Sequence, residues 1–286
     1  MRILVIGSGG MLGHMTTLYL AEKGYDVCDI SKTKKCREET VLLDVCDTRT
    51  FSQYLKQHYF DVVINCVALL VGASEANPQM AHAINEEFPH WLENFFEGTP
   101  TQIIQVSTAG VFQGSNAPYP ETADCDARGC YNITKYRGEL HNSKDLTVRS
   151  DFWGPDMCEE ASGLFHWIMT AEGVVNGFSN VVINGVSSLE FVCFIEEILG
   201  TSMTGIYHLH SEEPISKADL LRKICATFER TNIRVLGVTE PRRNTCLKTV
   251  TTHTTYHPKG YEQQMTELKE WMEKHRELYS HYFIQK

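Results

Sequence analysis

At 286 residues, the chain is long enough for one large α/β domain, or for such a domain with a smaller addition. Its hydrophobic share of 42% and its charged share of 22% are typical of a globular protein, and the lack of an apolar run of roughly 20 residues predicts a cytoplasmic protein that does not enter a membrane. The net charge of -10 argues against nucleic-acid binding, and 10 cysteines without a CxxC pair or a His/Cys cluster predict reduced thiols and no metal site.

The first half of the chain alternates strands and helices. Apolar runs predict strands at 2–6, 25–30, 40–45, 60–68, 101–107 and 146–150. Helical patterns cover 11–23 and 78–97, and a further helix begins at Tyr131. Continuous apolar strands separated by helices are typical of a parallel sheet covered on both faces. Residues 1–150 are therefore predicted to form a Rossmann-type doubly wound α/β domain.

The pattern loosens after about residue 150. Strands are predicted at 180–185 and 205–210, and helices at 216–230 and 261–277, whereas 239–253 has no clear period. We expect residues 151–286 to form mainly a smaller C-terminal lobe over the strand ends, where ligands bind in such folds. Residues of about 176–200 are expected to return to the first domain.

A glycine-rich turn, GSGGMLGH, joins the first strand to the first helix. Gly7, Gly10 and Gly13 allow a sharp turn, a close approach of the backbone to a pyrophosphate, and tight packing of the helix on the strand. The helix N-terminus then directs N–H groups at the anion. Because the turn lies between a strand and a helix, it predicts a dinucleotide site; turns elsewhere are glycine-rich without this function.

The end of the second predicted strand bears on the choice of cofactor. Ser31 and Lys32, with Lys34 or Lys35, are suited to the 2′-phosphate of NADP, although the same residues also fit a solvated basic loop. Asp29 would favour the ribose hydroxyls of NAD if it closed the strand. We predict NADP as the preferred cofactor and keep NAD open.

Polar or small residues also follow the next strands. Asp44 follows the third strand, Asn65 and Ala68 the fourth, and Ser107 and Thr108 the fifth. Each one alone also suits an ordinary turn or cap. Together they are predicted at one edge of the sheet, and this shared placement favours a site there.

Tyr131 and Lys135 stand four residues apart in CYNITKYRGELH, so a helix places them on one face. In this order, the glycine turn, Asp44, NCVA, STAGVF and YNITK resemble an extended short-chain dehydrogenase/reductase. Within that family the chain is most similar to the dTDP-4-dehydrorhamnose reductases and related nucleotide-sugar reductases. The stretches PYPETADCDARGCYNITKYRGE, GIYHLHSEEPISKADLLRKI and EPRRNTCLKT extend the resemblance over nearly the whole chain.

The resemblance implies a reductase of the C4 ketone of a nucleotide-activated deoxysugar. Tyr131 is then the general acid, Lys135 favours the tyrosinate and binds the nicotinamide ribose, and Thr108 bonds the ketone oxygen, with Ser107 as the alternative. Asn85 matches a family helix position near the site, or is a plain polar residue. The implied cofactor contacts are Gly7, Gly10, Met11, Leu12, Gly13, Ser31, Lys32, Asp44, Val45, Asn65, Ala68, Tyr131 and Lys135.

Substrate contacts are less directly indicated. Trp153 or Phe152 would line the sugar pocket, with a place in the core as the alternative. Arg242 and Arg243 would bind the substrate diphosphate, with a solvated turn as the alternative. The family usually has Asp-Tyr where this chain has Ala109-Gly110, often Asp where it has Gln113, and Arg-Pro where it has Glu240-Pro241-Arg242. These departures bear on sugar specificity.

Two other functions compete with reduction. A nucleotide-sugar epimerase of the same fold would return the hydride to its substrate, and a non-catalytic NADP-binding regulatory subunit would use the fold without turnover. A dehydratase is less favoured, because Ala109-Gly110 supplies neither acid nor base. The sequence leaves open the nucleotide, the product stereochemistry and whether the chain forms a homodimer.

Overall fold

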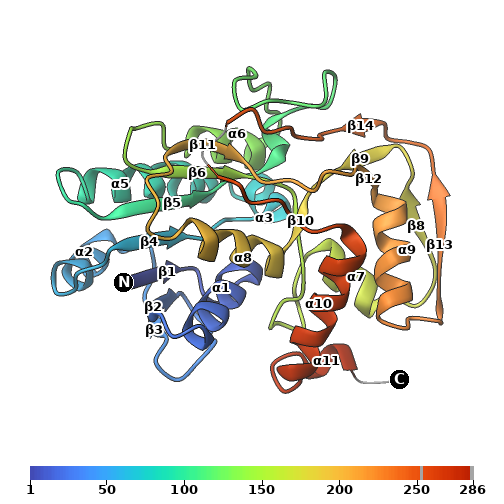
Figure 1. Ribbon diagram of the computed structural model, residues 1–286, viewed down its shortest axis with the longest axis horizontal. Helices are drawn as coiled ribbons and strands as arrows, with labels where there is room; N and C mark the ends of the chain where they lie inside the picture. The colour runs from blue at the N-terminus through green and yellow to red at the C-terminus, as the bar shows by residue number, and fades with distance from the viewer. Residues whose placement is uncertain (252–253, 284–286) are drawn as a thin grey trace.

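A seven-stranded parallel sheet organises the first part of the chain (Figure 1). The computed structural model describes residues 1–251 and 254–283. In the sheet the strands follow the order β11-β6-β5-β4-β1-β2-β3. Their bounds are β1 Arg2–Ile6, β2 Asp26–Ser31, β3 Val41–Leu42, β4 Val62–Asn65, β5 Gln102–Val106, β6 Leu146–Arg149 and β11 Gly205–His208. The predicted Rossmann-type doubly wound sheet is confirmed.

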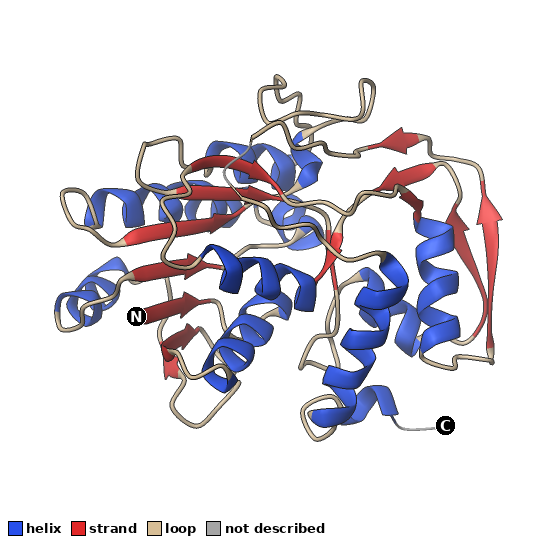
Figure 2. Ribbon diagram, viewed as in Figure 1, coloured by secondary structure: helices blue, strands red, loops and turns tan. Residues whose placement is uncertain are grey.

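Alternate side chains of the strands bury against helices on opposite faces, which the two layers of helices in Figure 2 make visible. Ile3 and Val5 of β1 join the cluster of α1 (Met11–Glu22) and α8 (Ser188–Ile198). Leu4 and Ile6 join that of α2 (Thr48–Lys56) and α5 (Phe88–Phe95). Successive side chains of a strand therefore pack into two different apolar cores, one on each face of the sheet. Because both faces are buried, the strands are continuous apolar runs in the sequence.

The helices between β3 and β5 differ from those predicted. The helix expected at 78–97 consists of α4 (Pro78–Ala81), a π-helical segment η1 (His82–Glu87) and α5. Two helices were missed, α2 and α3 (Val71–Ala76). The start of α2 does have a local signal, because the Asp47 side chain accepts a hydrogen bond from the backbone N–H of Thr50 at 3.1 Å.

The C-terminal lobe combines short strands with helices, on the right of Figure 1. The strands pair as β10-β7, β12-β9-β14 and β13-β8. Their bounds are β7 Phe152–Trp153, β8 Gly173–Phe178, β9 Val181–Ile183, β10 Val186–Ser187, β12 Ile215–Ser216, β13 Ile233–Val238 and β14 Arg243–Asn244. The helices are α7 Leu164–Thr170, α9 Lys217–Thr227, α10 Tyr261–Lys274 and α11 Ser280–Phe283. The aperiodic stretch 239–253 contains β14, and its residues 252–253 lie outside the described part.

The chain crosses back to the large sheet within its second half. Helix α8 packs on α1, and β11 pairs in parallel with β6. The sequence had not indicated α8, which is buried along most of its length. The division at residue 150 stays a prediction.

Three general properties bear on function. Among residues 1–251 and 254–283, no helix has both the length and the apolar character to cross a membrane. The same residues contain no group of three or more His, Cys, Asp or Glu side chains arranged to hold a metal ion. All ten cysteines are free thiols.

Candidate active site

The turn after β1 is shaped by contacts that only glycine permits. Gly7 has a φ of +91°, in the left-handed region. A Cβ on Gly13 would lie 2.0 Å from the carbonyl oxygen of Gly7, and a Cβ on Gly9 would lie 2.4 Å from Ser31 Oγ. Helix α1 therefore packs directly on the turn, with Gly10 as its N-cap residue. The N–H groups of its first turn have no acceptor within the helix and suit an anion.

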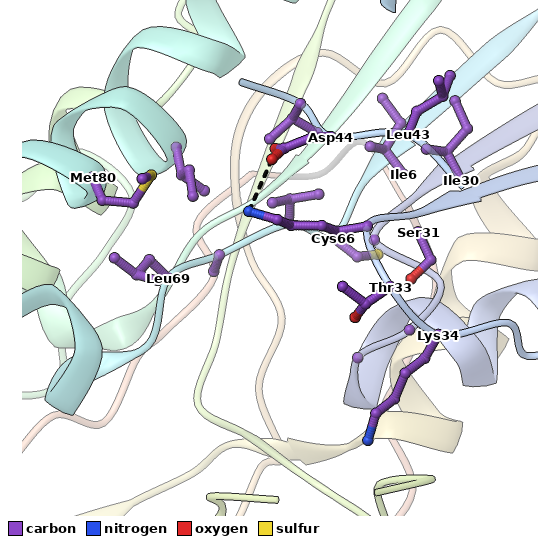
Figure 3. A pocket seen from close by; sticks show the side chains of 18 residues that line it. Ile6, Ile30, Ser31, Thr33, Lys34, Leu43, Asp44, Cys66, Leu69 and Met80 are labelled. Atoms are coloured by element: carbon purple, nitrogen blue, oxygen red, sulfur yellow. Dashed lines mark ion pairs between the residues drawn. The ribbon is translucent and has the colours of Figure 1, made fainter. Parts of the chain in front are cut away.

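A pocket of about 350 Å³ opens beside this turn, between the ends of β1, β2 and β4 (Figure 3). Met80 and Leu69 lie on one side of it, and Ile6, Ile30 and Leu43 on the other. The lining residues are Ile6, Gly7, Gly9, Gly10, Ile30, Ser31, Lys32, Thr33, Lys34, Leu43, Asp44, Val45, Cys66, Val67, Ala68, Leu69, Met80 and Ile84. Its apolar walls with a few polar groups suit an adenosine, and the glycine cradle beside them suits a pyrophosphate. The residues present thus fit a dinucleotide.

Polar groups at the rim of the pocket are already paired. Lys32 Nζ lies 2.8 Å from Asp44 Oδ2. Although burial raises the pKa of Asp44, hydrogen bonds from Lys32 and the Cys46 backbone hold it below its usual range. Lys34 extends from the rim, where its ammonium contacts Cys158.

Asp29, the residue that would have favoured NAD, is buried and paired, so it is not available to ribose hydroxyls. It lies inside β2, two residues before the strand ends at Ser31, and it is 1% exposed. Arg37 Nε donates to Asp29 Oδ1 at 2.6 Å. Its carboxylate is therefore neutralised within the protein, and Ser31 and Lys32 occupy the strand end instead.

Five other predicted cofactor residues differ in position. Val45 and Ala68 line the pocket. Asn65 is completely buried below it, donates to Gln105 Oε1 at 2.7 Å, and accepts from the Val67 backbone at 3.2 Å. Asn65 thus shapes the loop after β4. Met11 and Leu12 begin α1, where their backbone N–H groups belong to the first turn.

Tyr131 and Thr108 come together beyond β5. Tyr131 lies in the first turn of α6 (Cys130–Arg137) and is half-buried. Burial raises the pKa of Tyr131 to about 12, the charge of Asp151 adds to the rise, and a hydrogen bond with the Thr108 side chain opposes it. This direction is opposite to the one expected from a neighbouring cation, because loss of water and a nearby carboxylate both disfavour the phenolate.

Lys135 lies one turn further along α6 and is 2% exposed. Its ammonium donates to the carbonyl oxygen of Val106, at the end of β5, at 2.6 Å. Burial lowers the pKa of Lys135 to about 8, while the charges of Glu139 and Cys66 act against this change. The lysine therefore ties the helix that carries Tyr131 to the strand that leads to Thr108.

Ser107, the alternative to Thr108, belongs to a buried polar network. Its hydroxyl donates to Glu139 Oε1 at 2.6 Å. Arg149 holds both oxygens of the same carboxylate, at 2.8 Å from Nε and 2.5 Å from Nη2, and lies 3.3 Å from His208 Nε2. Ser107 thus braces the ends of β5, β6 and β11. Thr108 is the hydroxyl that contacts Tyr131.

Asp151, which sequence reasoning missed, follows β6 beside Thr108. The backbone N–H of Ala109 donates to the carbonyl oxygen of Ser150 at 2.9 Å, which sets the two loops side by side. Thr245 Oγ1 donates to Asp151 Oδ2 at 3.2 Å. Burial raises the pKa of Asp151, while Lys217, Thr245 and Arg243 oppose the rise. A carboxyl after a strand is too common in turns to signal a site by itself.

The predicted substrate residues divide between core, solvent and site. Trp153 is 2% exposed in the main core, close to Tyr261, so it occupies the alternative position foreseen for it; Phe152 packs edge-on against Phe191. Arg242 lies in solvent with its side chain 76% exposed and pairs with Glu240 at 3.4 Å. Arg243 is half-buried and donates to the carbonyl oxygen of Phe112 at 2.7 Å. Of the two arginines, Arg243 is the one near Asp151.

Two further positions discussed in the sequence, Asn85 and Gly110, have clear structural surroundings. Asn85, within η1, accepts from the Leu69 backbone N–H at 2.8 Å and donates to Thr134 Oγ1 at 3.2 Å. It therefore joins the pocket loop to α6. A Cβ on Gly110 would lie 2.3 Å from Asn132 Oδ1. The space that a side chain would take at residue 110 is thus filled by Asn132.

The apolar wall of the pocket was also missed. Met80 and Ile84 come from the helix region after β4, and Leu43 directly follows the short β3. Their apolar character was visible, but helical periodicity gives no distance between α4 and the end of β2. Only the packing of the elements brings them to one cavity.

Comparison with known proteins gives a consistent result. The family model of the RmlD substrate binding domain matches residues 1–148. The dTDP-4-dehydrorhamnose reductase of Mycolicibacterium smegmatis is 31% identical over 239 residues, which are 80% of this chain and 68% of that one. Methionine adenosyltransferase 2 subunit beta of Xenopus laevis is 25% identical over 258 residues, 84% of this chain and 75% of that one.

Structural similarity extends over almost the whole chain. A crystal structure of dTDP-4-dehydrorhamnose reductase from Bacillus anthracis in complex with NADP superposes with a TM-score of 0.79, at 19% identity, over 94% of this chain and 99% of that one. At this identity the likeness shows the fold. Other matched dTDP-4-dehydrorhamnose reductases align with this chain over 43% or 44% of their own length.

Proposed function

The chain belongs to the RmlD family of extended short-chain dehydrogenases/reductases, which are NAD(P)-dependent oxidoreductases, and we propose that it reduces the C4 ketone of a nucleotide-activated deoxysugar. The family match confirms the resemblance found in the sequence. One observation carries the proposal: the side chains of Thr108 and Tyr131 interact at the strand-end edge that also bears the glycine turn.

NADPH is the cofactor that the pocket favours. Ser31 and Lys32 line the pocket where the 2′-phosphate would lie, and Lys34 adds a second cation. Asp29, paired with Arg37, has no free carboxylate for ribose hydroxyls. Asp44 suits the adenine amino group. The relative crystallised with NADP supports the same choice, and NAD remains the second candidate.

The residues around Tyr131 suit proton delivery to a ketone. When bound, the nicotinamide cofactor supplies the hydride. Tyr131 donates its proton to the C4 oxygen, and Thr108 holds that oxygen by a hydrogen bond. Because burial and Asp151 raise the pKa of Tyr131 to about 12, the phenol is protonated at neutral pH, as reduction requires. Lys135 holds Val106 and, as in the family, would contact the nicotinamide ribose.

The substrate side is proposed to lie within residues 151–286, apart from the stretch that returns to the sheet. Arg243, with Arg242 at the rim, is proposed to bind the diphosphate, because guanidinium groups match phosphate geometry. The half-buried position of Arg243 beside Asp151 favours it over the exposed Arg242. Cytoplasmic location and a homodimer stay predictions.

A second function has a specific observation in its favour. The matched Xenopus laevis protein is named as a subunit of an adenosyltransferase, and the alignment covers 84% of this chain. A regulatory subunit would bind the dinucleotide without turnover. Tyr131, Thr108 and Lys135 together favour catalysis.

Turnover separates these functions. Wild-type protein is incubated with NADPH or NADH and a panel of nucleotide 4-keto-6-deoxysugars, and absorbance follows oxidation of the cofactor. We expect faster turnover with NADPH, and a loss of about 10²- to 10⁴-fold in Tyr131→Phe with cofactor binding retained. Conversion of a sugar without net oxidation of NADPH would indicate an epimerase. Binding of NADPH without reduction of any ketosugar would contradict the reductase proposal and favour the regulatory role.

A further inference from the structure

Helix α1 is held at both ends by the C-terminal segment, defined here as residues 261–283. At its C-terminal end, Glu22 pairs with Lys274 and His275. At its N-terminal end, His14 Nε2 lies 2.7 Å from the hydroxyl oxygen of Tyr279. Both His14 and Tyr279 are completely buried, although they are 265 residues apart in the chain.

The donors and acceptors of this contact form one directed chain. The carbonyl oxygen of Gly10 only accepts, so His14 Nδ1–H donates to it, at 2.9 Å. His14 Nε2 then accepts from the Tyr279 hydroxyl, whose oxygen accepts from Trp271 Nε1 at 3.3 Å. Burial lowers the pKa of His14, although its bond to Gly10 acts against this. The neutral imidazole can accept at Nε2 while it donates from Nδ1–H.

The end of this chain is the residue that begins the helix at the glycine turn. Gly10 is the N-cap of α1, and its own N–H donates to the carbonyl oxygen of Gly7 at 3.1 Å. Its carbonyl accepts from the His14 backbone at 3.0 Å as well as from the His14 ring. Gly10, which precedes the free N–H groups of the first turn, is therefore held at both its N–H and its carbonyl.

We propose that Tyr279 and His14 are positioning residues for the cofactor. Tyr279 acts through His14 on Gly10 and holds the glycine turn in the orientation that binds a pyrophosphate. The inference rests on the proposed dinucleotide site. It assigns to the C-terminal segment, which lies beyond the family match at residues 1–148, a part in binding the cofactor.

The test is the affinity for two nucleotides that share the pyrophosphate. Binding of NADPH and NADH to Tyr279→Phe is measured by fluorescence titration, together with kcat and KM. Loss of one hydrogen bond from the chain is expected to raise Kd about three- to tenfold, by the same factor for both nucleotides, with kcat unchanged. His14→Asn keeps an amide near Gly10 but, because its side chain is shorter, has no atom at the position of Nε2 to accept from Tyr279. This variant should weaken binding, and combining it with Tyr279→Phe should add no further loss.

Tyr282→Phe is the matched control. Tyr282 lies on the same segment, and its hydroxyl lies 2.9 Å from His166 Nδ1 and accepts from the Asp156 backbone at 3.1 Å. Neither bond joins Tyr282 to His14 or to the glycine turn. Its Kd values should equal those of the wild type. The inference would be overturned if Tyr279→Phe and Tyr282→Phe weakened nucleotide binding equally. It would also be overturned if both Tyr279→Phe and His14→Asn bound the nucleotides as tightly as the wild type. Neither result would affect the proposed function. Failure of the wild type to bind either nucleotide would overturn the proposed function with it.

Discussion

The two sides of the site are built in different ways. On the cofactor side, the turn after β1 depends on contacts between backbone atoms. A Cβ atom added to Gly13 would collide with the carbonyl oxygen of Gly7. On the substrate side, the ends of β5 and β6 are joined through side chains, with Glu139 bonded to both Ser107 and Arg149. The family match, over residues 1–148, includes the glycine turn and also Ser107 and Glu139 of the second side.

This difference has a consequence for function. A dinucleotide pyrophosphate is the same in every reaction, so a backbone cradle suits it whatever the substrate. Recognition of a particular sugar depends on the side chains around it, and Asp151 and Arg243 are such side chains on the proposed substrate side. Substitutions on the two sides should therefore fail in different ways.

The buried network should give the largest effect on stability. Glu139→Gln leaves Arg149, which is 3% exposed, without its counter-charge. We expect the free energy of unfolding to fall by about 3–5 kcal/mol in urea titrations. Replacing both residues, as Glu139→Leu with Arg149→Met, should recover much of this loss.

An exposed ion pair provides the control for that measurement. Lys223 and Glu262 lie 2.9 Å apart, with side chains 39% and 89% exposed. Glu262→Gln should change the free energy of unfolding by no more than about 1 kcal/mol. A similar small change in Glu139→Gln would show that the buried network does not brace the substrate side.

A methyl group at the glycine turn should damage the cofactor side. Gly13→Ala places a Cβ against the Gly7 carbonyl, a backbone atom that moves only with the strand. We expect a loss of about 1–3 kcal/mol in stability and clearly weaker binding of NADPH. Gly72→Ala, in α3 with open space around it, should be neutral or stabilising by up to about 1 kcal/mol. Unchanged NADPH affinity in Gly13→Ala would contradict the close packing.

Substitution of two neighbouring arginines should distinguish a residue that binds substrate from one that lies in solvent. Arg243→Ala is expected to raise KM for the nucleotide sugar about tenfold, because the proposed charged hydrogen bond to the diphosphate would be lost. Arg242→Ala, at an exposed position, should change KM less than twofold. Kinetics at saturating NADPH measure both. A larger effect at Arg242 would reverse the assignment.

Asp151→Asn should have the smallest effect at neutral pH and a clear one in alkali. The Asp151 charge raises the pKa of Tyr131, so its removal lowers that pKa. Since Tyr131 donates only when protonated, the alkaline fall of kcat/KM for reduction should move to lower pH. Lys217, Arg243 and Thr245 face Asp151, and they stay in place in this variant.

Asp156→Asn is the control for the alkaline profile. Asp156 follows β7 and acts on Tyr282 and His14. The profile of this variant should match the wild type. An unmoved alkaline limb in Asp151→Asn would show that Asp151 does not act on the proton of Tyr131.

Much of the fold was predictable because its signals are local. Each strand of the large sheet was predicted within a few residues, including β11, for which a strand was predicted at 205–210. The glycine turn falls where the spacing of Gly7, Gly10 and Gly13 indicated. Helices α2, α3 and α8 were not predicted. Their apolar faces are short or continuous, and periodicity alone does not separate such segments from loops or strands.

The sequence by itself determined the sheet, the glycine turn and the pairing of Tyr131 with Lys135 on one helix. These depend on neighbours a few positions apart and on which residues lack a Cβ. The tertiary structure decided that Asp29 is neutralised by Arg37, that Arg243 rather than Arg242 lies near Asp151, and that Tyr279 reaches His14. Each of these contacts depends on a distance set by the packing of whole elements, and no local pattern encodes that distance.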